Sequence, residues 1–309
     1  MKKLDKIIEH KFPIVAEVLK GIGQIMLQEN IYTGLFFTIG IFFGSISMGI
    51  AVLLATLVGT LTAKVLKYDQ KEISMGLYGF SPALVGVALS FLFKSEIIVW
   101  VLIIVGAAAA AITQHFFIKK NIPVFTFPFI IVTWILVTIL HHFSSIPPSE
   151  SFISVPDLSN IDNFTSETNG FGEVIFQGSI WAGLLFFIGV YISSPVAALY
   201  GLMGSALSAA ISFHVHEPIN QISMGLFSFN AVLCAITFAG DKKRDGILVF
   251  LSVVICVIIN IALVNSNFTI LQTAGGPFTL PFVLAACLVL PLKIRKDAIS
   301  SKIQSIIRL

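Results

Sequence analysis

Four polar residues that stand inside or at the edge of long apolar segments form two pairs. They are Gln24 with Glu173, and Thr126 with Thr279. Their amide, carboxylate and hydroxyl oxygens accept hydrogen bonds, but they do not bring opposite charges together to hold an ion. No nucleophile–base pair or metal triad accompanies them. The chemistry that they suit is therefore the binding of a solute rather than its conversion.

Large apolar side chains stand beside these acceptors, again in pairs. The pairs are Phe80 with Phe229 and Leu84 with Leu233. A thin planar molecule with several N–H donors could slide edge-on along the acceptors while its faces rest against the phenylalanine rings. These residues predict a narrow passage for a small uncharged polar solute.

The composition places this passage in a membrane. Hydrophobic residues make up 56% of the 309 residues and charged residues 11%, whereas soluble domains carry about 25% charged residues. Because lipid offers the backbone no hydrogen-bond partners, apolar runs that approach the ~20 residues of a membrane span must be helical. The chain is predicted to be an all-α polytopic membrane protein. Its apolar runs are 34–63, 73–93, 97–114, 122–140, 181–211, 222–239, 246–265 and 278–292.

The sequence contains a duplication. Residues 72–80, EISMGLYGF, recur 149 positions later as QISMGLFSF, with six of nine positions identical. The motif TFPF at 126–129 recurs as TLPF at 279–282. We expect a first repeat over 1–143 and a second over 172–309. The linker 144–171, rich in Ser, Pro, Asn and Asp, is expected to be an exposed loop.

Basic residues predict how the two repeats are oriented. With about five crossings in each repeat and a cytoplasmic N-terminus, nearly all Lys and Arg fall in cytoplasmic segments, as the positive-inside rule requires. The loop 64–71 then lies inside with three lysines, while its counterpart 214–218 lies outside with none. The repeats are therefore expected to be inverted in the cell membrane. The linker would lie outside, and the basic C-terminal tail would lie on cytoplasmic anionic lipid.

Interrupted helices at matching positions indicate where the solute passes. One pair is 76–86 with 225–235, and the other is 121–129 with 275–282. A proline inside an apolar run removes a backbone donor, so the freed carbonyl needs a partner or a wet cavity. We expect interrupted or re-entrant helices around a central pore between the repeats.

Two of these motifs resemble those of a known family. Thr126-x-Pro128-Phe129 preceded by Pro123, and Thr279-x-Pro281-Phe282, are similar to the paired LPxxTxPF motifs of the urea transporter family. The stretch 79–86 resembles the Asn-Gly-x-Leu-Val-Gly stretch of that family. The resemblance implies a homotrimer in which each protomer passes urea down its gradient.

The resemblance also implies roles for individual residues. Gln24 and Glu173 would accept N–H bonds at two outer binding sites, and Thr126 and Thr279 would line the narrow middle. The slot would be formed by Phe80, Leu84, Phe229, Leu233 and Phe176, with Leu27 opposite Phe176 across the repeat. The chain departs from the family pattern at Ser81-Pro82, at Asn230-Ala231 and at Gly276-Pro277. These departures leave the fold intact but leave open which of urea, small amides and water is selected.

Three other functions compete with a urea channel. One is a channel for other small amides or neutral polar solutes, and another is an ion-coupled carrier, for which the spans offer no second acid or Asp–Arg pair as a coupling site. A membrane-embedded enzyme would need a catalytic pair that the spans lack. No metal or cofactor is expected. The three cysteines lack ligand spacing, and His214-x-His216 is expected to be solvated.

Overall fold

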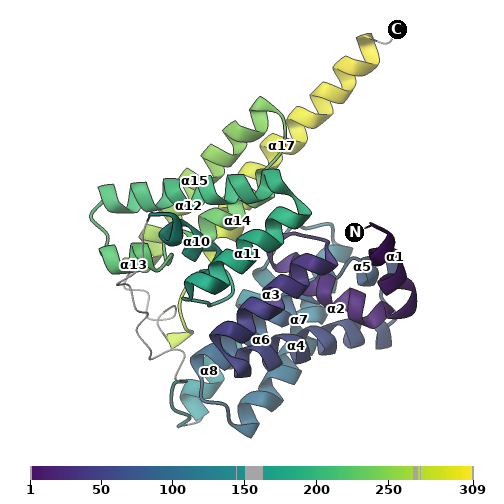
Figure 1. Cartoon of the computed structure of the whole chain (residues 1–309), viewed down its shortest axis with the longest axis vertical. Coiled ribbons are helices and arrows are strands. Elements are labelled where there is room, and N and C mark those ends of the chain that lie inside the picture. The colour runs from purple at the N-terminus through teal and green to yellow at the C-terminus, as the bar shows by residue number, and fades with distance from the viewer. Residues whose placement is uncertain (1, 144, 150–162, 267–270, 272, 308–309) are drawn as a thin grey trace.

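The computed structural model describes residues 2–143, 145–149, 163–266, 271 and 273–307, and it consists almost entirely of helices (Figure 1). Within these ranges the sole extended pairing is an isolated bridge between Phe93 and Pro148. The predicted all-α class is confirmed.

The helices follow one another in the same order twice. The first half comprises α1 (Lys2–Lys11), α2 (Pro13–Gly23), the 3-10 helix η1 (Gln24–Met26), α3 (Ile31–Gly44), α4 (Ile46–Val65), α5 (Gln70–Ser74), α6 (Phe80–Leu92), α7 (Ile97–Lys119) and α8 (Phe127–Phe143). The second half comprises α10 (Asn163–Glu173), α11 (Ile180–Ser193), α12 (Pro195–His214), α13 (Ile219–Ser223), α14 (Phe229–Phe238), α15 (Lys243–Val264) and α17 (Leu280–Ile307). Each helix from α3 to α6 begins 149 residues before its counterpart from α11 to α14.

Helix lengths separate full spans from partial ones. α4, α7, α12 and α15, of 20 to 23 residues, are long and apolar enough to cross a membrane. A fifth span results if α2, η1 and α3 count as one span bent by 77°. The other apolar helices, α6, α8, α11, α14 and the segment 280–294 of α17, have 10 to 17 residues. At about 1.5 Å per residue they fall short of the ~30 Å of hydrocarbon, as interrupted helices do.

Two long apolar runs, 34–63 and 181–211, are each divided into two helices, which hydropathy alone does not reveal. Ser45, in extended conformation, ends α3, and its hydroxyl accepts the Met48 N–H at 3.4 Å. Ser194 ends α11 and accepts the Ala197 N–H at 3.2 Å. Serine at an N-cap satisfies a backbone donor that the new helix leaves free, so each break is stabilised inside an apolar run.

Part of the segment predicted to be a loop is a helix. A loop is predicted over 144–171, but α10 begins at Asn163, and its residues 168–172 are buried. Hydropathy misses this helix because contacts with other elements hold it in place. Asn169 donates from Nδ2 to the Ser223 carbonyl at 2.9 Å, and the Phe171 ring packs against Phe187 with centroids 5.6 Å apart.

A tight turn follows each of the short helices α5 and α13 and leads into α6 and α14. Gly76 has φ +79 and Gly225 has φ +87, a region that residues with a Cβ rarely adopt. A Cβ on Gly76 would lie 2.4 Å from the Gly21 backbone nitrogen, and one on Gly225 would lie 2.7 Å from the Asn169 carbonyl carbon. Glycine at both positions lets each turn pack directly against the backbone of α2 or α10.

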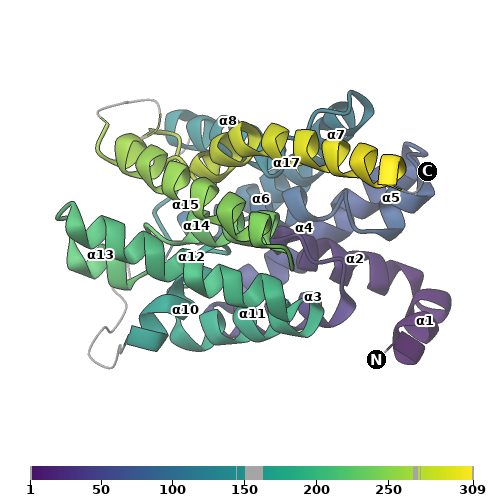
Figure 2. The ribbon, with the colours of Figure 1, turned by 90° about the horizontal axis from the view of Figure 1, so that it is seen from above.

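α3 and α11 pack along each other and join the two halves (Figure 2). Their Phe37 and Phe186 rings have centroids 5.0 Å apart. Phe186 fills the space where Gly40 has no side chain, and Phe37 does the same at Gly189. The Thr33 hydroxyl donates across this contact to the Gly189 carbonyl at 2.7 Å.

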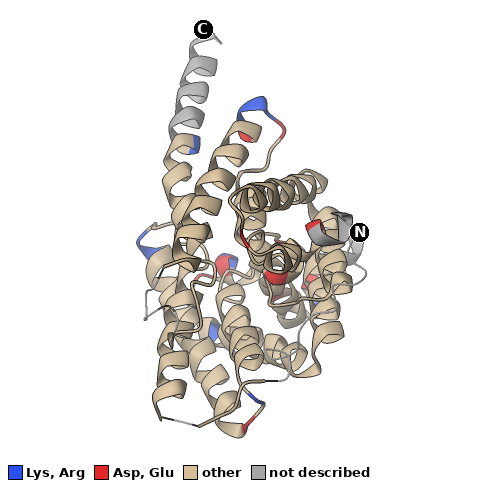
Figure 3. Ribbon diagram, turned by 90° about the vertical axis from the view of Figure 1, so that its left-hand side faces the viewer, with Lys and Arg blue, Asp and Glu red and all other residues tan. Residues whose placement is uncertain are grey.

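The outer surface suits a lipid environment. Charged residues, coloured on the ribbon of Figure 3, lie mostly at turns and helix ends. Large apolar side chains project outward from the helices, among them Phe43 and Ile46, both 70% exposed, and Ile97, 84% exposed. Such a surface would be unfavourable in water.

Candidate functional site

Thr126 and Thr279, which lie 153 residues apart, meet at the centre of the molecule. Each side chain is 3% exposed, and the two hydroxyl oxygens are 2.7 Å apart in a hydrogen bond that either can donate. Thr126 stands immediately before α8, and Thr279 immediately before α17. The residues before them, Phe125 and Phe278, have φ +48 and +47. The left-handed backbone at both places turns the chain so that each threonine faces the other.

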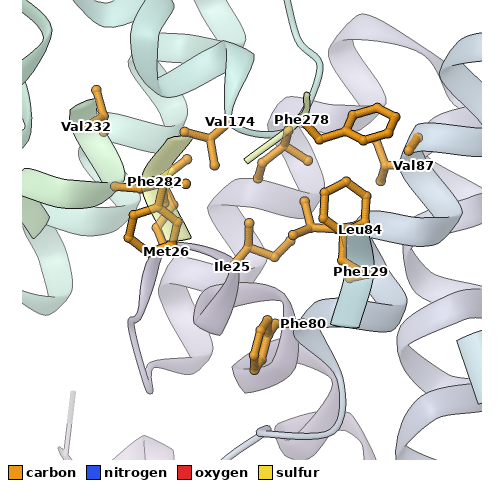
Figure 4. Close-up of a cluster of buried hydrophobic side chains, with 14 of the residues drawn as sticks. Ile25, Met26, Phe80, Leu84, Val87, Phe129, Val174, Val232, Phe278 and Phe282 are labelled. Atoms are coloured by element: carbon orange, nitrogen blue, oxygen red, sulfur yellow. The ribbon is translucent and has the colours of Figure 1, made fainter. Parts of the chain in front are cut away.

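Aromatic rings surround this pair in a symmetric arrangement. Phe129 packs against Phe278 with centroids 5.4 Å apart and planes at 57°, and Phe125 packs against Phe282 at 5.2 Å and 60°. Phe125 and Phe278 are 153 residues apart, as are Phe129 and Phe282, so the two contacts join equivalent pairs of residues. Figure 4 shows Phe129, Phe278 and Phe282 in one buried cluster with Phe80 and Leu84.

A third group of rings is found on one side only. Phe176 lies 5.3 Å from Phe91 and 6.0 Å from Phe278, centroid to centroid. Its counterpart in the first half, Leu27, has the same left-handed backbone, φ +58 against +59, but is 36% exposed and brings no ring. The aromatic wall is therefore thicker on the side of the second half.

The four predicted wall residues differ in exposure. Phe80 begins α6 and Phe229 begins α14; Phe80 is 7% exposed and Phe229 is half-buried. Leu84 and Leu233, one turn further along these helices, have no exposed surface. In this structure the two leucines pack in the core behind the phenylalanines.

A cavity of about 360 Å³ opens on the side of the second half and leads toward the threonine pair. Its walls include Glu173, Phe176, Phe229 and Thr279, which the sequence singled out. The structure thus joins an outer acceptor, two aromatic wall residues and a central hydroxyl in one continuous space.

Gln24 occupies the matching position at the other side, where η1 begins, and it is half-buried. Its Nε2 donates to the Met75 carbonyl at 3.0 Å, which leaves its amide oxygen as the acceptor. Because Met75 precedes Gly76, this bond ties Gln24 to the turn that leads into α6.

The hydrogen bonds made by two residues at the departures from the family pattern, Asn230 and Ser81, were not predicted from the sequence. Asn230 donates from Nδ2 to the Phe278 carbonyl at 3.2 Å, and its Oδ1 accepts the Phe282 N–H at 3.3 Å. It thereby bridges the break before α17. Ser81, its counterpart, instead donates to Gln114 Oε1 at 3.2 Å. The recurrence of Phe125-Thr126 as Phe278-Thr279 was a usable signal for the rings beside the threonines.

Comparison with known proteins agrees with this geometry. A family model described as "Urea transporter" matches residues 15–294. The chain belongs to the urea transporter family. It is 28% identical to urea transporter 1 of Rattus norvegicus over 238 residues, which are 72% of this chain and 62% of the rat protein. It is also 28% identical to urea transporter 1 of Ovis aries over 289 residues, 88% of this chain and 75% of the sheep protein. The chain thus spans less than two thirds of the rat relative.

Membership of the urea transporter family, a family of transport proteins, confirms the predicted multi-pass membrane protein. The matched range begins in α2 and ends in α17, so it contains every residue of the candidate site.

Proposed function

We propose that the protein lets urea cross a membrane by facilitated diffusion along the line from Gln24 through Thr126 and Thr279 to Glu173. The observation that carries this proposal is the contact between the two threonine hydroxyls, because it sets two uncharged acceptors at the middle of an apolar barrier. Family membership supports urea as the solute.

The chemistry of urea suits this lining. Urea is planar, donates four N–H bonds and accepts at its carbonyl, so its edge can bond to hydroxyls while its faces meet the rings of Phe80, Phe229 and Phe176. When the solute is absent the two threonines satisfy each other. A passing urea replaces that bond with bonds of its own, and no charge has to be buried in the apolar middle.

We also propose that the two halves are inverted repeats with both termini in the cytoplasm, and that α10 belongs to the second repeat. The matching helix bounds support the repeat, and the basic loop after α4 supports the orientation. The homotrimer and the cell-membrane location stay predictions from the family resemblance.

The test is stopped-flow light scattering of proteoliposomes under a urea gradient. We expect urea permeability well above that of empty liposomes, unchanged when proton and sodium gradients are collapsed. Loss of flux on collapse would indicate an ion-coupled carrier, and flux equal to that of empty liposomes would overturn the proposal.

Thr126→Val tests the lining with a nearly isosteric change. Removing one buried hydroxyl leaves a solute N–H or the Thr279 hydroxyl unpaired, a cost of about 1–3 kcal/mol, so we expect urea flux to fall about tenfold. Thr38→Val is the matched control, since Thr38 is also buried but bonds to the Gly34 carbonyl of its own helix at 2.7 Å. Equal flux in the two variants would contradict the role of Thr126.

A further inference from the structure

The carboxylate of Glu173 is the one ionisable group among the described residues that line the 360 Å³ cavity. It has no hydrogen-bond or ion-pair partner within the parts of the chain that the structure describes. A carboxylate that faces a cavity without a cation costs free energy unless a donor from outside reaches it. The cavity therefore presents an acid without a partner among the described residues, and a cation entering the cavity would stabilise its ionised form.

The matching position in the first half lacks this property. Gln24 is uncharged, and its amide N–H is already bonded to the Met75 carbonyl. An ionised Glu173 cannot donate in that way, and no bond joins it to Met224, the counterpart of Met75. The two positions thus differ by one ionisable group and by one internal hydrogen bond.

The remaining walls of the cavity suit a flat, delocalised cation. Phe176, Phe229 and Phe278 contribute rings, whose faces attract cations. Gln221 and Asn260 contribute amide groups, and Asn260 is tied to the Leu226 carbonyl at 3.4 Å. The volume could hold roughly ten water molecules at ~30 Å³ each, so the space admits a small ion together with some of its hydration.

We propose that the Glu173 cavity binds guanidinium, a planar cation of nearly the shape of urea, and that the bound ion blocks urea from this side only. The inference rests on the proposed function, because the cavity must be one mouth of the urea path. Guanidinium would form a charge-assisted, two-point contact with the carboxylate while its face rests on a ring. Urea would form only the neutral version of the same contact.

The ion stops at the threonine pair. Thr126 and Thr279 are each 3% exposed, uncharged and bonded to each other, and the surrounding side chains are apolar. Moving a full charge from the carboxylate into that setting is far more costly than moving a neutral solute. Guanidinium therefore occupies the mouth without crossing the membrane.

The experiment measures urea flux in right-side-out and inside-out vesicles, with millimolar guanidinium added to one face at a time. We expect block in one vesicle orientation. Glu173→Gln, which keeps the shape but removes the charge, should weaken the block about tenfold, the difference between a charge-assisted and a neutral hydrogen bond. Gln24→Glu should create a block at the other face, and the double exchange should reverse the sidedness. Each block is expressed relative to the same variant's own flux without guanidinium.

Glu217→Gln is the matched control, because it removes a negative charge beside α13 without touching the cavity; Glu217 is bonded to Asn265 at 2.8 Å. It should leave the block unchanged. Equal block from both faces, equal weakening by Glu217→Gln, or uptake of radiolabelled guanidinium into the vesicles would each overturn the proposal.

Two readouts separate this proposal from the proposed function. Urea flux without guanidinium tests the channel alone. Equilibrium binding of radiolabelled guanidinium to the purified protein, lost in Glu173→Gln, tests the site alone. Normal urea flux without such binding would refute the guanidinium site but not the channel. Binding without urea flux would refute the channel but not the guanidinium site.

Discussion

The two halves share one backbone plan but stabilise it with different side chains. In the first half Lys64 pairs with the buried Glu17 at 2.6 Å, and Lys20 pairs with Glu9 at 2.7 Å and Glu29 at 3.2 Å. The second half places Asn169 where the first has Lys20 and Phe227 where the first has Tyr78. The plan is thus independent of any one polar network. It depends on what both halves keep: left-handed turns, serine caps and a threonine before each interrupted helix.

Tyr78 illustrates the contrast most clearly. Its hydroxyl donates to Glu72 at 2.5 Å and is 2.9 Å from His115 Nδ1, and the His115 ring stacks on Tyr68. This cluster holds the turn next to Phe80. At the positions that correspond to Tyr78, Glu72 and Tyr68 the second half has Phe227, Gln221 and Glu217, and the same turn forms without the cluster. Substitutions at features that both halves share should therefore have larger effects than substitutions at features that only one half has.

Gly76→Ala and Gly225→Ala should have the largest effect, and an equal one. Each adds a Cβ within 3 Å of backbone atoms at a left-handed position, and backbone strain alone costs about 1–2 kcal/mol. We expect little monodisperse protein on size exclusion in detergent. Gly276→Ala is the control, since Gly276 has φ +101 but no atom within 4 Å of the place that a Cβ would take, so it carries the strain without the clash. Wild-type yield for Gly76→Ala would show that the turn is not fixed as described.

Thr279→Val should reduce urea flux by the same factor as Thr126→Val, about tenfold. The two hydroxyls form one hydrogen bond and are equally buried, so the centre belongs to both halves alike. Because they are partners, the double variant should lose less than the product of the two single factors. Stopped-flow permeability measures all three. A tenfold difference between the single variants would mean that the centre is not shared.

Asn230→Ser, which imports the residue of the first half, should destabilise the protein by about 1–3 kcal/mol. Serine cannot reach both the Phe278 carbonyl and the Phe282 N–H, and both groups are buried. Thermal unfolding in detergent should show a lower midpoint, while the exposed Asn220→Ser should not shift it. An unchanged midpoint for Asn230→Ser would show that the break before α17 is held by other contacts.

Tyr78→Phe should have the smallest effect, about 1 kcal/mol or less, because the second half already folds with phenylalanine there. The reverse change, Phe227→Tyr, should cost more. Phe227 is 1% exposed, and its surroundings lack the Glu72 and His115 partners, so the new hydroxyl would be buried without a bond. Unfolding midpoints compare the two. A larger loss for Tyr78→Phe would mean that the Tyr78 cluster is essential to the first half.

The sequence was most informative where a chemical requirement is repeated. Apolar runs specify the membrane class because lipid leaves helices as the only solution for such runs. Two copies of a Thr-x-Pro-Phe motif indicated the two residues that meet at the centre. A duplicated motif near a break is informative because an interface between repeats brings equivalent positions together.

Features that depend on contacts between distant segments could not be predicted. The helix α10 has the composition of a loop and is held by Asn169 and Phe171. The role of Asn230 depends on carbonyl and N–H groups about 50 residues away that the break before α17 leaves without a partner in the helix. The burial of Leu84 and Leu233 is likewise a property of the packed core rather than of spacing along their helices.

The α3–α11 contact has a consequence for how fast solute can move. Phe37 and Phe186 each fill a notch at a glycine of the opposite helix, and Thr33 is bonded across the seam. Sliding one half over the other would empty both notches, so rigid-body rocking of the alternating-access kind is opposed. Under the proposed function, passage of urea would depend on rotation of side chains, which takes picoseconds to nanoseconds, and not on collective domain motion, which takes microseconds to milliseconds. The rate of urea transport should then be that of a channel rather than of a carrier, with its constriction at the Thr126–Thr279 hydrogen bond.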